Sequence, residues 1–258
     1  GFGEPTPLPQ MESPAGAAGF AEATAALSAA ETESLRNFAR QRQTTLNTLV
    51  QAAWAAWLGR QSGRNDVVFG AAFSGRPAEL TGVENIVGSF VTDLPVRVRL
   101  DGSKSVGNWL VELQAAQVQL SQHQFNSPMQ IQEWSEVPWR LRLFESLVVF
   151  QNYTIADAAW RLGEARIEKF VAPIRTNFPV TLVVQPNAEL AVTLIHDTRK
   201  FRTQAAAEAL RELLHALQQI VLKPGQSIGE LLAAMPAPKT VAAGPAKFRT
   251  ASQNYIAP

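Results

Sequence analysis

The chain has 258 residues, of which 46% are hydrophobic and 17% charged, and its net charge at neutral pH is +1. This composition indicates a globular protein with one large domain or two small ones, and it argues against a nucleic-acid binder, which normally carries a basic face. No apolar run approaches the roughly 20 residues that span a bilayer, and the absence of cysteine excludes disulfides, thiolate metal sites and a cysteine nucleophile. We therefore expect a cytoplasmic chain with no nucleic-acid or membrane partner.

The N-terminal residues predict a connector followed by a helix. Residues 1–19 are rich in proline and glycine, contain no start methionine, and are expected to be an extended connector in a longer protein. Ser28 and Glu31 form a capping-box pattern, in which the hydroxyl and the carboxylate satisfy free amides at a helix start. The helix is predicted to run to about residue 41.

A second helix and two strands follow. Apolar residues at three- and four-residue spacing predict a helix from about Thr45 to a stop at Gly63. Residues 66–73 form a short apolar run that is typical of a buried strand. Residues 94–100 alternate between apolar and arginine side chains, which predicts a half-buried strand.

The remainder mixes helices and strands. Helices are predicted over 105–123, 128–134, 203–222 (capped by Thr203) and 227–235. Strands are predicted over 146–153, 164–171, 179–186 and 189–197, and the last two form a hairpin. The pattern predicts one α/β domain over 20–235, followed by a linker over 236–258.

The residues show no catalytic motif. His215 is interpreted as structural, His123 as a cap or turn residue, and His196 beside Asp197 as a surface pair. The sequence has no nucleophile elbow, phosphate-binding glycine loop or His-Glu metal motif, so we predict neither catalytic nor metal-binding residues. The six tryptophans are interpreted as core and sheet filler and not as a stacking platform.

The connection between the strands at 66–73 and 94–100 is unusual. It contains the turn Ser74-Gly75-Arg76-Pro77 and then Thr92-Asp93 within an otherwise apolar run. From the residues alone, a long surface loop with a buried return is the favoured interpretation.

Several stretches, taken in order, resemble one family. "DVVFGAAFSGRP" and "GSFVTDLPVR" are similar to a strand, an SGRP turn and a stretch reading GxFxNTLPxR in the C-terminal half of condensation domains from nonribosomal peptide synthetases. The resemblance continues through "HQFNSPMQIQEWS", "LFESLVVFQNY" and "TNFPVTLVV". The opening "GFGEPTPLP" resembles the family's crossover between halves, and "FRTASQNYIAP" the lead-in to a carrier-protein domain.

The resemblance implies a fold and a function. The fold would be α/β, one half of a chloramphenicol-acetyltransferase-like architecture with a mixed sheet flanked by helices. The function would be that of the acceptor-side half of an enzyme that joins two carrier-bound thioesters into an amide or ester. The family's catalytic HHxxxDG motif is absent from this sequence, so the chain is expected to be inactive alone.

The resemblance also implies site residues. The segment after the SGRP turn would form part of the floor of a tunnel between two halves, with Arg76 held by backbone carbonyls or by Glu84. The implied tunnel residues are Ser74, Arg76, Ser89, Thr92, Asn152 and Asn177. The family usually has Asn where Thr92 stands and Thr where Asp93 stands, so a contact made by that Asn is in doubt here.

The implied partners are the N-terminal condensation subdomain and the upstream donor and downstream acceptor carrier proteins. The carriers would bring substrates on 4'-phosphopantetheine arms, and no cofactor would bind the chain directly. Residues 153–173 would contain a segment that projects from the core. Two alternatives stay open: half of an acyl-CoA-dependent acyltransferase of the same superfamily, and a non-catalytic docking or scaffold domain.

Overall fold

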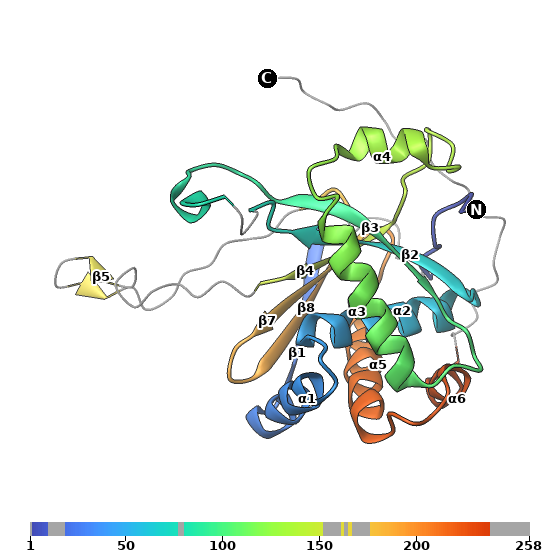
Figure 1. The fold of residues 1–258 in the computed structure, drawn as a ribbon. Coiled ribbons are helices and arrows are strands. Elements are labelled where there is room, and N and C mark those ends of the chain that lie inside the picture. Colours follow the sequence, from blue (N-terminus) through green and yellow to red (C-terminus); the bar gives the residue numbers. More distant parts are fainter. Residues whose placement is uncertain are drawn as a thin grey trace.

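The computed structural model describes residues 2–9, 19–76, 80–151, 161–162, 165–166 and 176–237. A six-stranded mixed sheet with the strand order β1-β8-β7-β4-β2-β3 forms its centre (Figure 1). The strands are β1 (Phe20–Leu27), β2 (Asp66–Phe73), β3 (Thr92–Arg99), β4 (Ser146–Phe150), β7 (Val180–Pro186) and β8 (Leu190–Asp197). β4 is parallel to both of its neighbours, β7 and β2, and the other pairs are antiparallel.

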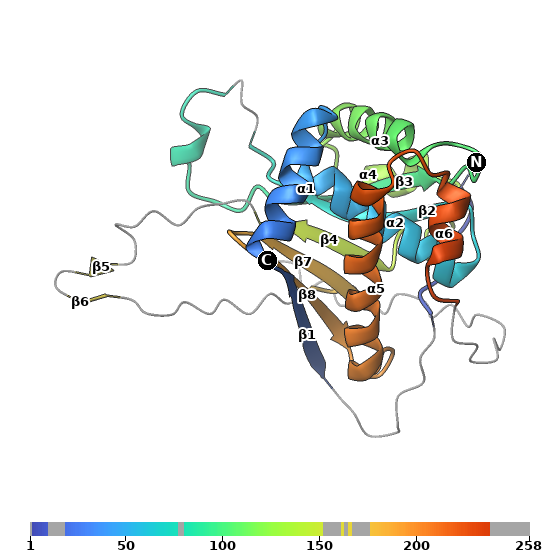
Figure 2. The same ribbon diagram turned by 90° about the horizontal axis from the view of Figure 1, so that it is seen from below.

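Most of the helices cover one face of this sheet. They are α1 (Ala29–Gln41), α2 (Leu46–Ser62), α3 (Val106–Ser121), α5 (Thr203–Leu222) and α6 (Ile228–Ala234). These five helices, called the helix layer below, lie together on one side in both ribbon views, whereas α4 (Pro128–Trp134) lies across the sheet from them (Figures 1 and 2). The predicted α/β fold, a mixed sheet flanked by helices, is confirmed.

The main core fills the space between the sheet and the helix layer. Alternate residues of each strand point into it, as with Val67, Phe69 and Ala71 of β2, all at most 1% exposed. Trp54 and Trp57 of α2 are stacked with ring centroids 4.8 Å apart. Burial of these rings fixes α2 on the sheet. The face of the sheet away from the helix layer remains open to other contacts.

The predicted helix ends are largely present. Ser28 and Glu31 form the capping box at the start of α1, and α2 ends at Gly63, whose φ of 69° lies in the left-handed region that favours glycine. The predicted hairpin is the antiparallel pair β7–β8. The prediction that Thr203 caps α5 is wrong, because Arg202 occupies the N-cap position and Thr203 is the first helical residue.

The structure differs from the predicted strands at two places. The sequence did not predict β1, although its eight residues pair with β8 along their whole length. Of the predicted strand 164–171 the structure describes only β6 (Ala165–Arg166), which pairs with β5 (Arg161–Leu162). This pair lies away from the six-stranded sheet in Figure 2, as expected for a projecting segment, and the rest of 153–173 lies outside the described residues.

The described part of the predicted connector lies beside β2. The hydroxyl oxygen of Thr6 accepts a hydrogen bond of 2.6 Å from the backbone N–H of Val68, and Pro5 and Thr6 are buried. Residues 10–18 and 238–258 lie outside the described residues, so the proposed connector and linker stay predictions.

The tryptophan prediction is only partly right. Trp54, Trp57 and Trp109 are buried in the core. Trp134 and Trp139, at 67% and 78% exposed, stand on or just after α4 and fill no core.

Candidate functional site

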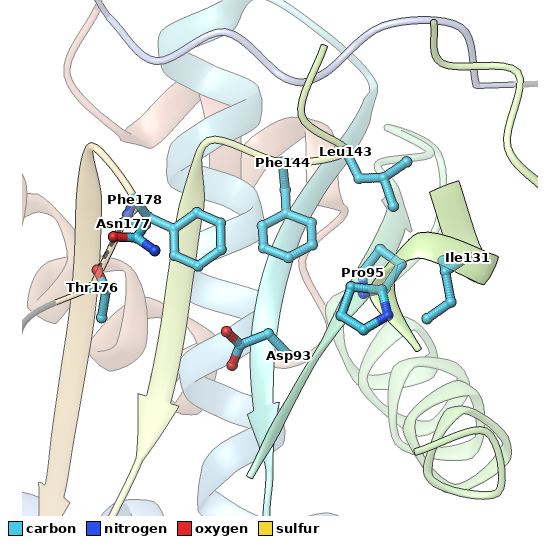
Figure 3. Close-up of a pocket in the computed structure, with 9 residues that line it drawn as sticks. Asp93, Pro95, Ile131, Leu143, Phe144, Thr176, Asn177 and Phe178 are labelled. Carbon is cyan, nitrogen blue, oxygen red and sulfur yellow. Dashed lines mark hydrogen bonds between the residues drawn. The ribbon is translucent and has the colours of Figure 1, made fainter. Parts of the chain in front are cut away.

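A pocket of about 420 Å³ opens on the sheet face opposite the helix layer. Its walls come from β3, α4 and the segments that precede β4 and β7 (Figure 3). The lining residues are Asp93, Pro95, Pro128, Ile131, Leu143, Phe144, Thr176, Asn177 and Phe178. We call it the Asp93 pocket. Four segments that are far apart in the sequence thus meet at one place.

The alternation of β3 brings two residues to this pocket. Leu94 and Val96 are buried in the core, so Asp93 and Pro95 point to the opposite face. β3 is an edge strand, and an edge strand tolerates a proline because its missing N–H leaves no partner strand unpaired. The "TDLP" sequence therefore folds as a strand and still presents a carboxylate outward.

A glycine in β2 makes room for the pocket wall. A Cβ atom at Gly70 would clash with the ring of Phe144, so the ring lies directly over the strand backbone. Phe144 also stacks on Phe178, with ring centroids 5.0 Å apart. Together with Val68 and Leu147 these rings belong to a second apolar cluster on this face. The pocket wall is therefore a packed, preformed surface.

Asp93 supplies the charge of the pocket. Its side chain is partly buried and makes no hydrogen bond or ion pair to any other residue of the described part of the chain. Figure 3 shows its carboxylate pointing into the pocket, with Phe144 and Phe178 above it. Burial raises the pKa of the Asp93 carboxyl above its ordinary value. Asp93 is therefore a hydrogen-bond acceptor without a counter-ion among the described residues, in a hollow that Thr176, Asn177 and apolar side chains also line.

Residues 74–91, called the 74–91 loop, connect β2 to β3, and the described residues 80–91 project from the sheet in Figure 1. Gly75 has a φ of 63°, and a Cβ atom there would clash with the carbonyl of Phe90, so the two ends of the loop touch. Arg76 donates hydrogen bonds to the carbonyls of Val83, Ile86 (3.0 Å) and Gly88 (3.4 Å). Its guanidinium also lies 4.4 Å from the centroid of the Phe90 ring. Arg76 therefore stabilises the loop through contacts with other residues of the same loop.

Apolar side chains are exposed on this loop and near α4. Val87 and Val91 are 98% and 64% exposed, and Leu80 and Ile86 are also exposed. Phe125, Met129, Trp134 and Trp139 are exposed on and around α4. Each of the two segments therefore leaves apolar side chains open to contact with another protein.

The six predicted tunnel residues lie in different places. Asn177 lines the Asp93 pocket, and its carbonyl accepts a hydrogen bond from Arg142. Arg76 binds backbone carbonyls, as the sequence predicted, and the side chain of Glu84 is outside the described residues.

Three of the other four predicted residues are not among those that line the pocket. Ser74 and Ser89 are exposed on the 74–91 loop, and Ser74 Oγ accepts a hydrogen bond of 3.4 Å from the backbone N–H of Arg76. Thr92 begins β3 beside Asp93. Asn152 lies outside the described residues.

The pocket residues that were not predicted all stand in stretches that resemble the condensation-domain family. Pro128 and Ile131 stand in "HQFNSPMQIQEWS", Leu143 and Phe144 open "LFESLVVFQNY", and Phe178 stands in "TNFPVTLVV". Asp93 stands in "GSFVTDLPVR". Each stretch was recognised separately, but only the fold shows that they share one pocket.

The interpretation of His196 and Asp197 as a surface pair is wrong. His196 is 0% exposed on the helix-layer side, against Phe201, and its Nδ1 has no hydrogen-bond partner among the described residues. Asp197 is buried and pairs instead with Arg199, at 2.7 Å. Burial lowers the pKa of the His196 imidazole. His196 is therefore a core residue that does not line the Asp93 pocket.

His196 should make stability depend on pH. Because the folded state holds its pKa below the ordinary 6.5, the unfolded chain takes up the proton first as the pH falls, and stability is lost through and below that value. Between pH 7.5 and 5.5 we expect the wild type to lose about 1 kcal/mol more unfolding free energy than His196→Gln, measured by urea denaturation. Equal slopes in the wild type and His196→Gln would contradict the assignment.

The other two histidines are exposed. His123 is exposed in the turn after α3, as expected, and His215 is exposed on α5. Within the described ranges no group of three or more His, Cys, Asp or Glu residues could hold a metal ion. None of the helices described has the length and apolarity of a membrane span.

Comparison with known proteins identifies the family. A family model described as "Condensation domain" matches residues 1–240. A linear gramicidin synthase of Brevibacillus parabrevis is 40% identical over 236 residues, which cover 90% of this chain and 3% of that protein. Chondramide synthase cmdD of Chondromyces crocatus is 34% identical over 232 residues, which cover 90% of this chain and 6% of that protein.

Solved structures share the fold. A four-domain nonribosomal peptide synthetase, holo-AB3403, matches with a TM-score of 0.73 and 19% identity over 88% of this chain and 18% of that chain. The condensation domain of the Monacolin K polyketide synthase MokA matches with a TM-score of 0.71 and 19% identity over 84% of this chain and 52% of that chain. The chain thus spans about half of that condensation domain and a few per cent of the curated synthases. On the evidence of the family match, the fold and the ordered motifs that line the Asp93 pocket, the chain belongs to the condensation domain family.

Proposed function

We propose that this chain is the acceptor-side half of a condensation domain, which joins two carrier-bound thioesters into an amide or an ester in nonribosomal or hybrid peptide synthesis. The observation that carries the proposal is the meeting of four motifs in one pocket. The stretches that resemble condensation domains lie far apart in the sequence, and each contributes residues to the Asp93 pocket.

The proposed chemistry needs a second half. An amine or hydroxyl of the acceptor would attack the donor thioester carbonyl, and the donor's thiol would leave. Placing both substrates end to end between two halves raises their effective concentration, which lowers the barrier without a covalent intermediate on the protein. The sequence contains no His-His pair, so the histidine that assists the reaction would come from the N-terminal half.

The open face of the sheet is the proposed meeting surface. α4 lies across the sheet from the helix layer (Figure 1), and the Asp93 pocket lies between β3, α4 and the segments that precede β4 and β7. The 74–91 loop leads directly into β3. Ser74, Arg76, Ser89, Thr92 and Asn177 belong to this region, and with Asn152 they are proposed to line the tunnel. The donor and acceptor carriers, each with a 4'-phosphopantetheine arm, are the proposed partners that bring substrate.

A turnover assay tests this function. The chain would be mixed with loaded donor and acceptor carrier proteins, alone and after assembly with an N-terminal half that carries HHxxxDG, and product would be measured by mass spectrometry. We expect product only from the assembled pair, with complex formation checked by size-exclusion chromatography.

Each other outcome argues against the proposal. Product from this chain alone would contradict its role as a half without the catalytic histidine. A complex that forms but yields no product would favour a docking or scaffold domain. Turnover with free acyl-CoA in place of the donor carrier would favour the acyl-CoA-dependent acyltransferase.

A further inference from the structure

The Asp93 pocket combines a charge without a partner and two aromatic rings, those of Phe144 and Phe178. Burial disfavours a carboxylate unless a cation neutralises it or it takes up a proton. Two arginines on the neighbouring segments are both engaged elsewhere. Arg97 forms an ion pair with Asp66, in which Nη2 of Arg97 lies 2.7 Å from Oδ2 of Asp66. Arg142 donates a hydrogen bond to the backbone carbonyl of Asn177. Asp93 therefore has no counter-ion within the described part of the chain.

The surroundings favour a particular kind of cation. A metal ion needs several oxygen or nitrogen ligands, and no suitable group of acidic or histidine side chains exists in the described ranges. The wall around Asp93 instead combines apolar groups with two polar residues, Thr176 and Asn177. The apolar groups are the rings of Phe144 and Phe178, the aliphatic side chains of Ile131 and Leu143, and Pro95 and Pro128. The faces of aromatic rings attract organic cations, and aliphatic groups accept an apolar body.

The size of the pocket limits the ligand. A volume of about 420 Å³ lies at the lower end of the range of small-molecule sites. The pocket can therefore hold one small molecule or one side chain. At the rim, the exposed side chain of Asn177 offers one more polar group.

We propose that the Asp93 pocket binds the ammonium group of a small organic amine whose apolar body rests against Phe144 and Phe178. The ammonium donates hydrogen bonds to the carboxylate and neutralises its charge, which no neutral or anionic ligand can do. This assignment rests on the pocket alone, so it stands or falls separately from the proposed condensation activity.

Direct binding to the full 258-residue chain tests the assignment. The probe is 2-phenylethylamine, and its neutral partner of the same shape is 2-phenylethanol, both titrated at about pH 7.5 by calorimetry or NMR. We expect the amine to bind at least about tenfold more tightly than the alcohol in the wild type. In Asp93→Asn and Asp93→Thr the two affinities should lie within about twofold of each other.

The control variant is Glu189→Gln, which removes an exposed carboxylate from the β7–β8 turn and should keep the wild-type preference. Two Asp93 variants are used so that the test still holds if one of them does not fold. Circular dichroism checks the fold of each variant. Three results would overturn the assignment: no saturable binding of the amine at millimolar concentration, equal binding of amine and alcohol in the wild type, or a preference for the amine that survives in both Asp93 variants.

Discussion

Gly70→Val is expected to lower the free energy of unfolding by about 3 kcal/mol, although valine is favoured in strands. The added side chain would occupy the space of the Phe144 ring, which lies over the backbone at this position. Displacing that ring also breaks its stacking on Phe178, which contributes about 1 kcal/mol. Urea denaturation would measure the loss, and a structure of the variant would show a disrupted Asp93 pocket.

The matched control is Gly225→Ala. No atom lies within 4 Å of where its Cβ would stand, and its change should stay within about 0.5 kcal/mol. If Gly70→Val were as stable as the control, the position of the Phe144 ring would not require a glycine at residue 70.

Arg76→Ala is expected to reduce the turnover of the assembled condensation domain at least about tenfold, with the unfolding free energy changed by less than about 1 kcal/mol. The side chain holds the 74–91 loop through three backbone carbonyls and the ring of Phe90, and few of these contacts involve the main core. Without it the loop would lose its shape, and small errors in positioning substrates have large effects on rate. The measurements are steady-state kinetics and a thermal melt of the same preparation.

Two further variants make this test specific. Arg76→Lys keeps the charge but not the planar fork that serves several acceptors, so it should show a loss similar to that of alanine. Arg211→Ala removes an exposed arginine from α5 and should leave turnover unchanged. Unchanged turnover and an unchanged melt in Arg76→Ala would mean that the loop is only a connection.

Elements whose signal lies within their own sequence were predicted well. The capping box of α1, the glycine stop of α2 and the β7–β8 hairpin depend on residues a few positions apart. β1 was missed because "FAEATAAL" is rich in alanine, a helix former, and becomes a strand only by pairing with β8 about 170 residues later. Its conformation is set by a tertiary contact.

In the candidate site, too, the features that depend on nearby residues could be predicted and those that depend on tertiary contacts could not. The turn at Arg76 and the unusual Asp93 are visible in the sequence, and the carbonyl contacts of Arg76 follow from the need of a long loop for internal hydrogen bonds. His196 was misinterpreted because its neighbour Asp197 lies on the other face of the strand, where sequence adjacency implies no contact. The Asp93 pocket could not be predicted, since only the sheet order brings its four segments together.

Hydrogen–deuterium exchange of the chain, with and without an N-terminal half that carries HHxxxDG, tests most directly whether this chain works as one half of a condensation domain through the open face of its sheet. We predict slower exchange on assembly in the 74–91 loop and in α4, and no change in α5 and α6 of the helix layer. Slower exchange confined to the helix layer, with the 74–91 loop and α4 unaffected, would contradict that arrangement.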